Sequence, residues 1–417
     1  MRYRISFLLV LGYFVCLTAE AQSSMSLQEA LKAARVNNLF LKTERYTIEA
    51  GQADVVSAKL RPNPALNNQT LQLANSKYYQ ENTAWNSPHN RQVWWQLTKP
   101  FQLPNQRKYR IDVANQGYNL INKNFLELER NVFFDVASKW LDVWIAQNQI
   151  RVIEIAKNNA DTLAKINALR LKNQVISETD LIRTQLLSEQ YAVQLKSVRQ
   201  DLLNKRSQLR FLIGTTDSVD VDLTNEFLFP ESINIDTLLR YALANRSDIQ
   251  QIQSMITLSE SNIKFQRSMA LPQPELGMIW NPQNTVPYVG FFGTIELPIF
   301  SRNQGEIQKS TILKKQAEQN YVTVQTQIQT EINTAYKSFI VQQQNVERFT
   351  GILQQAQSIL DRVRYAYLRG GTTIIDFLEA QRSWLETQQQ YYDAQQQYRQ
   401  SYIQLLFVSG LINQLAQ

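Results

Sequence analysis

Arg369-Gly370-Gly371-Thr372-Thr373-Ile374-Ile375-Asp376-Phe377-Leu378-Glu379-Ala380-Gln381 is the stretch that indicates how the whole chain is built. Its two glycines are expected to supply the positive φ that ends one helix. Thr373 and Asp376 have the spacing of a capping box, which begins another helix. From there a helical pattern continues to Gly410. The stretch therefore predicts a tight turn between two helices.

The same unit occurs earlier in the chain. Ser177-Glu178-Thr179-Asp180 opens a helical pattern that runs to Gly214. A shift of 196 residues brings identical residues of the two units together: Asp180 and Asp376, Gln185 and Gln381, Gln194 and Gln390, Leu209 and Leu405, Phe211 and Phe407, Gly214 and Gly410. The chain is therefore predicted to be built twice, with residues 1–21 as a signal peptide, 22–214 as the first repeat, 215–230 as a linker and 231–417 as the second repeat.

Each repeat also contains a predicted β-hairpin. Residues 26–60 are expected to form one helix, which Pro62 and Pro64 end, and Pro272 and Pro274 break the second repeat in the same way. The predicted strands follow these breaks, at residues 66–73 and 92–101 in the first repeat and at 275–280 and 288–299 in the second. Apolar and polar residues alternate along them with the period of a strand that has two unlike faces. Membrane strands and surface hairpins on a helical protein both fit this pattern.

A very long helix is predicted after each hairpin, at residues 107–172 and 306–368. In the second helix a seam of mostly apolar positions repeats in steps of four and three: 328, 332, 335, 339, 342, 346, 349, 353, 356, 360, 363 and 367. Such a seam is typical of a coiled coil. At 1.5 Å per residue the second helix would be about 95 Å long. Helices of this length need partners along their whole length.

The first 21 residues are typical of a secretory signal peptide. A basic start precedes an apolar core from Ile5 to Leu17, and Ala19-Glu20-Ala21 provides a cleavage site before Gln22. The alternative, a membrane anchor helix, would have a short apolar run for a bilayer span of about 20 residues. Cleavage would remove Cys16, the single cysteine of the 417-residue chain. No later run of about 18 apolar residues predicts a membrane helix.

Composition and motifs disfavour two broad classes of function. The formal net charge of +7 is spread along the chain without a Lys/Arg block, which does not favour nucleic-acid binding. No nucleophile elbow, phosphate loop or HExxH motif is found, so the sequence predicts no enzyme, no catalytic residue and no cofactor. It also predicts no metal site, and His89 in a polar loop is expected to be a surface residue rather than a metal ligand.

The chain resembles the TolC-like outer-membrane efflux proteins in its signal peptide, its ordered duplication, the stretch Gly371–Gln381 and the paired Gly214 and Gly410. The resemblance covers nearly the whole mature chain. Leu297–Gly305 is most similar to the branch that serves heavy-metal cation pumps. The resemblance implies a mainly α fold with a small β part. Each chain would give four strands to a 12-stranded β-barrel shared by a trimer, and long helical hairpins to a periplasmic α-barrel.

The resemblance also implies function and partners. The protein would be the outer-membrane channel of a tripartite efflux or export system, a passive exit duct that extends into the periplasm. It would carry metal cations or small toxic compounds delivered by an inner-membrane pump, of the resistance-nodulation-division type, and a periplasmic adaptor. The outer-membrane lipid would surround its strands. An alternative is a periplasmic coiled-coil adaptor or structural protein, which leaves the two hairpins unexplained.

Two sets of site residues follow from the resemblance. Asp376 and Glu379 match the acidic pair of the family's periplasmic constriction, and Asp180 and Arg183 occupy the equivalent turn of the first repeat. Arg183 would pair with a carboxylate and tie neighbouring helices together. The alternative is that the aspartates only cap their helices, which does not account for Glu379.

The tips of the helical hairpins are the predicted adaptor-docking sites. They comprise Asn173, Gln174, Gly370, Gly371 and Thr372. Asn173 stands near the position where the family usually has a glycine, and asparagine tolerates the left-handed conformation.

Overall fold

The computed structural model describes residues 24–223, 234–282 and 286–416. The predicted signal peptide and residues 224–230 of the predicted linker lie outside this range. Two compact units divide the chain. Unit 1 contains Met1–Thr43, Leu128–Arg246 and Gln327–Gln417, and unit 2 contains Glu44–Glu127 and Ser247–Thr326. Both units draw on both sequence repeats, whose boundaries stay a prediction.

The order of the elements repeats as the sequence predicts. The first series is α2 (Leu27–Asn37), α3 (Leu39–Lys59), β2 (Ala65–Gln72), β3 (Arg91–Pro100), α4 (Pro104–Lys172) and α5 (Glu178–Ile213). The second is α6 (Ile235–Asn245), α7 (Ser247–Met269), β5 (Glu275–Asn281), β6 (Tyr288–Thr294), α8 (Gln304–Leu368) and α9 (Ile374–Ser409). Short elements complete the described chain: β1 (Ser24–Met25), β4 (Asp220–Val221), η1 (Ser76–Tyr78), η2 (Pro88–Asn90) and η3 (Leu411–Ala416).

The single helix predicted over residues 26–60 is wrong, because Asn38 interrupts it. Asn38 leaves the helical region with φ −54° and ψ 130°. Its buried side chain accepts a hydrogen bond from the Leu41 amide at 3.0 Å and donates one to the Leu212 carbonyl at 2.6 Å. The side chain thus begins α3 and binds the end of α5, which stabilises two helices in place of one.

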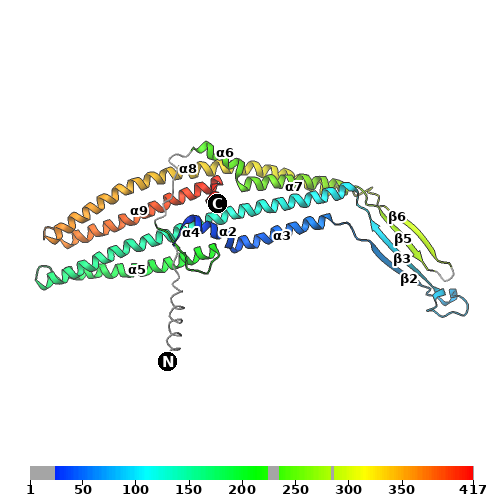
Figure 1. Cartoon of the computed structure of the whole chain (residues 1–417), viewed down its shortest axis with the longest axis horizontal. Helices are drawn as coiled ribbons and strands as arrows, with labels where there is room; N and C mark the ends of the chain where they lie inside the picture. The colour runs from blue at the N-terminus through cyan, green and yellow to red at the C-terminus, as the bar shows by residue number, and fades with distance from the viewer. Residues whose placement is uncertain (1–23, 224–233, 283–285, 417) are drawn as a thin grey trace, which may run out of the picture. The chain divides into compact units, whose positions relative to one another are not determined.

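The strands of unit 2 form one antiparallel sheet in the order β2-β3-β5-β6, shown in Figure 1. Both predicted hairpins are present, and β3 pairs with β5 across the two repeats. Strand β6 ends at Thr294, where residue 299 was predicted. The reason is that Thr294 faces Glu275, the first residue of β5, and Pro274 before it has no amide hydrogen to extend the ladder.

One face of the sheet carries an exposed row of apolar side chains across all four strands. Leu66 lies opposite Leu97, Leu97 opposite Met278, and Met278 opposite Phe291. All four side chains are exposed, Phe291 to 85%. A contiguous apolar surface of this kind marks a face that meets lipid or another protein.

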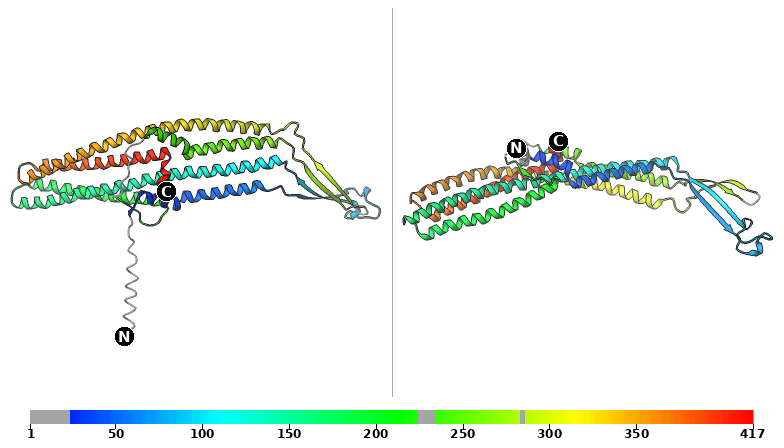
Figure 2. Two further views of the ribbon diagram at one scale, coloured as in Figure 1. Left: turned by 45° about the horizontal axis from the view of Figure 1, so that its top comes forward. Right: turned by 60° about the horizontal axis from the view of Figure 1, so that its bottom comes forward.

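In unit 1 two antiparallel helical hairpins lie side by side, α4 with α5 and α8 with α9, as Figure 1 and the other views in Figure 2 show. The seam predicted along α8 is confirmed, because every one of its positions is buried or half-buried. Phe339, a seam residue, stacks on Tyr398 of α9 with ring centroids 5.2 Å apart. Among the helices of the described chain, none combines the length and the apolarity needed to cross a bilayer.

Candidate gate and docking tips

The turn between α8 and α9 contains one left-handed residue. Gly370 has φ +79°, whereas Gly371 does not adopt a positive φ, so the prediction that both glycines supply it is wrong. One left-handed residue suffices because the amides of Gly370 and Gly371 then reach the carbonyls of Tyr367 and Ala366, at 3.1 and 2.8 Å. This pattern of bonds ends helices that have a left-handed cap.

The turn between α4 and α5 repeats this geometry with different residues. The left-handed residue is Gln174, with φ +60°, and not the predicted Asn173. The Asn173 amide still donates a helical bond to the Leu169 carbonyl at 3.1 Å, so Asn173, directly after α4, completes the last hydrogen bond of the helix. The Val175 amide then reaches back to Arg170 at 2.9 Å. Gln174 is the counterpart of Gly370 at the same shift of 196 residues.

Aromatic packing holds the second tip in place within unit 1. Tyr367 stacks on Phe377 with centroids 5.5 Å apart and an interplanar angle of 5°. Its hydroxyl donates to Asn167 of α4 at 2.8 Å, and Arg170 lies 4.8 Å from its ring centroid. Asn173, Gln174, Gly370 and Gly371 remain exposed beyond this packing, and Thr372 is half-buried. The two tips therefore offer exposed turns on a packed base.

Asp376 carries out the capping role that its spacing predicts. Its carboxylate accepts hydrogen bonds from the Thr373 amide at 3.1 Å, the Thr373 hydroxyl at 2.6 Å and the Thr372 hydroxyl at 2.7 Å. The bonds from Thr373 and Thr372 hold the pKa of Asp376 below its ordinary value. Asp376 is nevertheless exposed, so it presents a fixed negative charge at neutral pH.

Glu379 lies one turn further along the same exposed face of α9. Two exposed carboxylates on this face, Glu386 and Asp393, were not predicted from the sequence. They follow Glu379 by 7 and 14 residues, a spacing that could have revealed them, since residues seven apart share a helix face. Partial desolvation of the Asp393 carboxyl by its surroundings raises its pKa, although a hydrogen bond from Gln149 opposes the shift. The face therefore carries one carboxylate held by hydrogen bonds, that of Asp376, and three further acidic side chains.

Asp180 caps α5 in the same way, through a capping box with Ser177. Arg183 lies on the same helix, with Nη1 4.0 Å from the Asp180 carboxylate. This distance is at the limit of an ion pair, and Asp180 and Arg183 are three residues apart. Within one chain Asp180 and Arg183 thus lie on α5, and Asp376 and Glu379 lie on α9, while the predicted link from Arg183 to a neighbouring helix stays a prediction.

Metal-ligand chemistry is sparse in the part of the chain that the structure describes. It contains no group of three or more His, Cys, Asp or Glu side chains that could hold a metal ion. His89 lies exposed in η2, where the Ser87 hydroxyl caps the turn by accepting from the His89 amide at 3.3 Å.

Comparisons with known proteins agree with this architecture. Residues 238–411 match the model of the outer membrane efflux protein family. The cobalt-zinc-cadmium resistance protein CzcC of Cupriavidus metallidurans is 20% identical over 367 residues, which cover 87% of this chain and 85% of CzcC. The predicted likeness to heavy-metal efflux proteins thus has a counterpart among relatives of similar length.

Solved structures share the fold along nearly the whole chain. CusC superposes with a TM-score of 0.77 at 19% identity and covers 92% of this chain and 91% of its own. The CmeC outer membrane channel of Campylobacter jejuni gives 0.73 at 17% identity, with coverages of 92% and 85%. A coiled-coil adaptor or rod, by contrast, would leave the four-stranded sheet without a role. The duplicated fold and the family match over residues 238–411 confirm the resemblance to outer membrane efflux proteins that the sequence predicts.

Proposed function

We propose that this efflux duct conducts cationic cargo through an acidic constriction that Asp376 and Glu379 form in a trimer. Three copies would bring six carboxylates near a common axis. Such a ring repels anions, attracts cations and binds divalent ions through oxygen ligands. The observation that carries the proposal is that Asp376 is both exposed and held ionised by Thr372 and Thr373.

The choice of cationic cargo is supported by two further features. CzcC is named a cobalt-zinc-cadmium resistance protein, and this chain is similar to it over most of both lengths. Glu379, Glu386 and Asp393 continue the exposed acidic face of α9 at intervals of seven residues. Rings of carboxylates spaced along a duct give passing cations successive weak sites, which permits both entry and exit.

The capping role of Asp376 needs a matched control. Glu29 belongs to the same kind of capping box at the start of α2, so Glu29→Ala removes a cap without altering any residue of the predicted constriction. We expect Asp376→Ala with Glu379→Ala to raise single-channel conductance in planar bilayers, to lower cation selectivity and to weaken block by divalent ions. Glu29→Ala is expected to lose about 1 kcal/mol of stability, as cap removal does, with divalent block unchanged.

Wild-type conductance and divalent block in the double variant would show that the two acids only cap and solvate α9. Equal changes in the Glu29→Ala channel would show that loss of a helix cap, and not loss of the ring, alters conduction.

The two tips are the proposed docking site for a periplasmic adaptor, which would link the duct to an inner-membrane pump of the resistance-nodulation-division type. The exposed turns at Asn173, Gln174, Gly370 and Gly371, with Thr372 beside them, support this assignment. Exposed turns on a rigid scaffold are common sites of partner recognition. Tyr367 and Phe377 supply the rigid base here.

A further inference from the structure

The four connections between helices and strands in unit 2 meet at one end of the sheet, as Figure 1 shows. The register pairs Ala65 with Thr98, Pro100 with Glu275, and Glu275 with Thr294. The strand ends that lead to the helices therefore lie side by side. We call this region the sheet junction. It comprises the connections, two turns of each adjoining helix and the two nearest residues of each strand, which are residues 53–66, 99–110, 263–276 and 293–310.

Hydrogen bonds between the connections hold the sheet junction together. The Gln106 side chain of the first repeat donates to the Ser268 and Leu271 carbonyls of the second, at 3.0 and 3.1 Å. Arg107 of α4 donates to the Lys59 carbonyl at the end of α3, at 2.7 Å. The side chains of the sheet junction thus project from a packed base.

The sheet junction carries most of the positive charge that the chain has in excess. It contains ten basic residues, Lys59, Arg61, Lys99, Arg107, Lys108, Arg110, Lys264, Arg267, Arg302 and Lys309. It contains four acidic residues, Asp54, Glu275, Glu296 and Glu306. The excess is six, and the formal net charge of the whole chain is +7. The charge is spread along the sequence, but the sheet gathers it in space.

Three neighbouring basic groups of the sheet junction have no counter-charge within the described residues. Lys59, Arg61 and Lys99 are exposed, and their side chains make no hydrogen bond or ion pair with any described residue. Ala65 faces Thr98, so the segment that leads from α3 into β2 passes beside Lys99. The three groups therefore present positive charge to whatever lies outside the chain.

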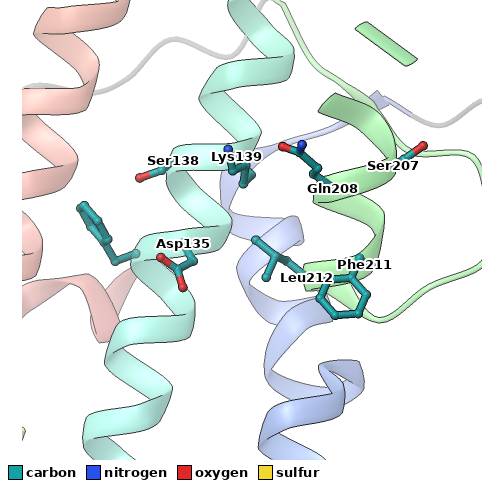
Figure 3. A pocket seen from close by; sticks show the side chains of 8 residues that line it. Asp135, Ser138, Lys139, Ser207, Gln208, Phe211 and Leu212 are labelled. Atoms are coloured by element: carbon teal, nitrogen blue, oxygen red, sulfur yellow. The ribbon is translucent and has the colours of Figure 1, made fainter. Parts of the chain in front are cut away.

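A groove in unit 1 shows the contrast. It has a volume of about 540 Å³ between α4 and α5, and Figure 3 shows the side chains that line it, among them Lys139. The Lys139 ammonium lies 2.9 Å from the Asp142 carboxylate. That lysine has its counter-charge within its own chain, so the groove offers no comparable charge to a ligand.

Exposed apolar side chains surround the bases of the sheet junction. Phe300 is 91% exposed. Six more exposed apolar residues belong to the same four segments: Leu60, Phe101, Leu271, Ile295, Leu297 and Ile299. Basic and aromatic side chains beside an apolar surface are typical of the zone where the hydrocarbon of a membrane meets its headgroups.

The sheet separates the two signs of charge. Lys99 follows Leu97 by two residues, so it lies on the face of the sheet that carries the exposed apolar row. Its partner across the ladder is Leu276, which is 55% exposed. Glu275 pairs with Pro100 and therefore lies on the other face. Positive charge thus accompanies the apolar face, and the carboxylate points away from it.

We propose that the sheet junction binds anionic phospholipids of the periplasmic leaflet, with Lys59, Arg61 and Lys99 at the phosphate and Phe101 and Phe300 beside the acyl chains. The inference rests on the proposed outer-membrane duct, in which the helices are on the periplasmic side of the strands. Clusters of basic side chains next to a membrane attract anionic lipid. A lipid fits better than an acidic protein because the same segments expose apolar and charged groups together.

Lipid binding is measured with the full protein in a neutral detergent. The protein is mixed with equal amounts of phosphatidylglycerol and phosphatidylethanolamine that have the same acyl chains, and native mass spectrometry counts the bound molecules. The test variant is Lys59→Gln with Arg61→Gln and Lys99→Gln. The control variant is Lys32→Gln with Lys196→Gln and Lys337→Gln, which removes the same charge from exposed positions of unit 1.

We expect the wild type and the control variant to prefer phosphatidylglycerol. The test variant is expected to lose at least about tenfold of that preference, because each base near a membrane surface favours anionic lipid about fivefold. Lys59→Arg with Arg61→Lys and Lys99→Arg keeps the charge and is expected to keep the preference. Circular dichroism checks the fold, and Lys99→Gln alone, with an expected loss of about fivefold, replaces a triple variant that does not fold.

Equal binding of both lipids to the wild type would overturn the inference and leave the bases to solvent or to an acidic protein. An equal loss in the control variant would show an effect of net charge and not of the sheet junction. Displacement of the lipid by an equal concentration of inorganic phosphate would show an ion site and not a lipid site. Cation selectivity in planar bilayers reports separately on the proposed function: selectivity without lipid preference overturns the lipid site alone, and lipid preference without selectivity overturns the cationic duct alone.

Discussion

At the scale of single residues, the two tips show how one backbone geometry is reached with different side chains. Gly370 adopts φ +79° with open space around the position of a Cβ atom, so the glycine serves the backbone alone. Gln174 adopts φ +60° at the equivalent position and carries a Cβ. A left-handed conformation costs a residue other than glycine about 1–2 kcal/mol. The first tip is therefore the more strained of the two.

Replacement of Gln174 by glycine is expected to relieve this strain. We expect Gln174→Gly to stabilise the α4–α5 hairpin by about 0.5–1 kcal/mol, because the relief exceeds the entropy cost of glycine. Slower hydrogen exchange of the amides near the tip would measure the gain. Asn173→Gly is the control and is expected to destabilise, since Asn173 has no positive φ for glycine to relieve. A gain at Asn173 and none at Gln174 would contradict the assignment.

At the scale of elements, a break in each short helical segment holds the end of a returning helix. Asn38 binds the Leu212 carbonyl of α5, and Arg246 donates to the Val408 carbonyl of α9 at 2.8 Å. The close approach explains a glycine at the end of α5: a Cβ on Gly214 would lie 2.2 Å from the Asn37 carbonyl oxygen. In each repeat a polar side chain at the helix break thus donates a hydrogen bond to a carbonyl near the end of the returning helix, although the side chain differs between the repeats.

Arg246 is expected to contribute more to stability than an arginine in an exposed ion pair does. It is 2% exposed and also pairs with Glu331 at 2.7 Å. We expect Arg246→Met to cost about 2 kcal/mol, because it leaves the Val408 carbonyl without its buried donor. Arg199→Met is the control. Arg199 pairs with Glu154 at 2.7 Å and both side chains are exposed, to 60% and 42%, so about 1 kcal/mol or less is expected.

Thermal unfolding followed by circular dichroism, at equal protein concentration, measures both variants. Equal losses of stability in the two variants would show that the burial of Arg246 does not strengthen its contact with α9.

At the scale of the whole molecule, a chain built twice has surfaces that its own elements leave uncovered. The sheet of unit 2 ends in β2 on one side and β6 on the other. In unit 1 Leu203 and Phe211 of α5 are exposed, although their counterparts on α9, Arg399 and Phe407, are half-buried. Open sheet edges and exposed apolar faces favour association with further chains. The two units thus provide separate reasons for assembly.

Docking of an adaptor at the tips is the prediction at this scale. A photo-crosslinking residue placed at Gln174 or Gly370 is expected to link the trimer to a co-expressed periplasmic adaptor. The same residue at Asp217, exposed beyond the opposite end of α5, is the control and is expected to give no such link. Links from Asp217 and none from the tips would place the docking site elsewhere on unit 1.

Most helices and strands could be predicted from the sequence, because they depend on local chemistry. Capping boxes at Ser177 and Thr373, glycine ends at Gly214 and Gly410, and the seam along α8 all act within a few residues of each other or at a fixed period. The duplication then followed from one shift of 196 residues. The acids at Asp180 and Asp376 were predicted as caps on the same local ground.

The contacts between those elements follow from the fold and could not be read from local patterns. The break at Asn38 depends on a carbonyl 174 residues away in α5, which no local pattern reveals. The left-handed role of Gln174 was missed because glutamine gives no sign of positive φ. The contrast between exposed Phe211 of α5 and half-buried Phe407 of α9 also required the fold. These equivalent positions differ because Phe134 of α4 packs against Phe407 within the chain.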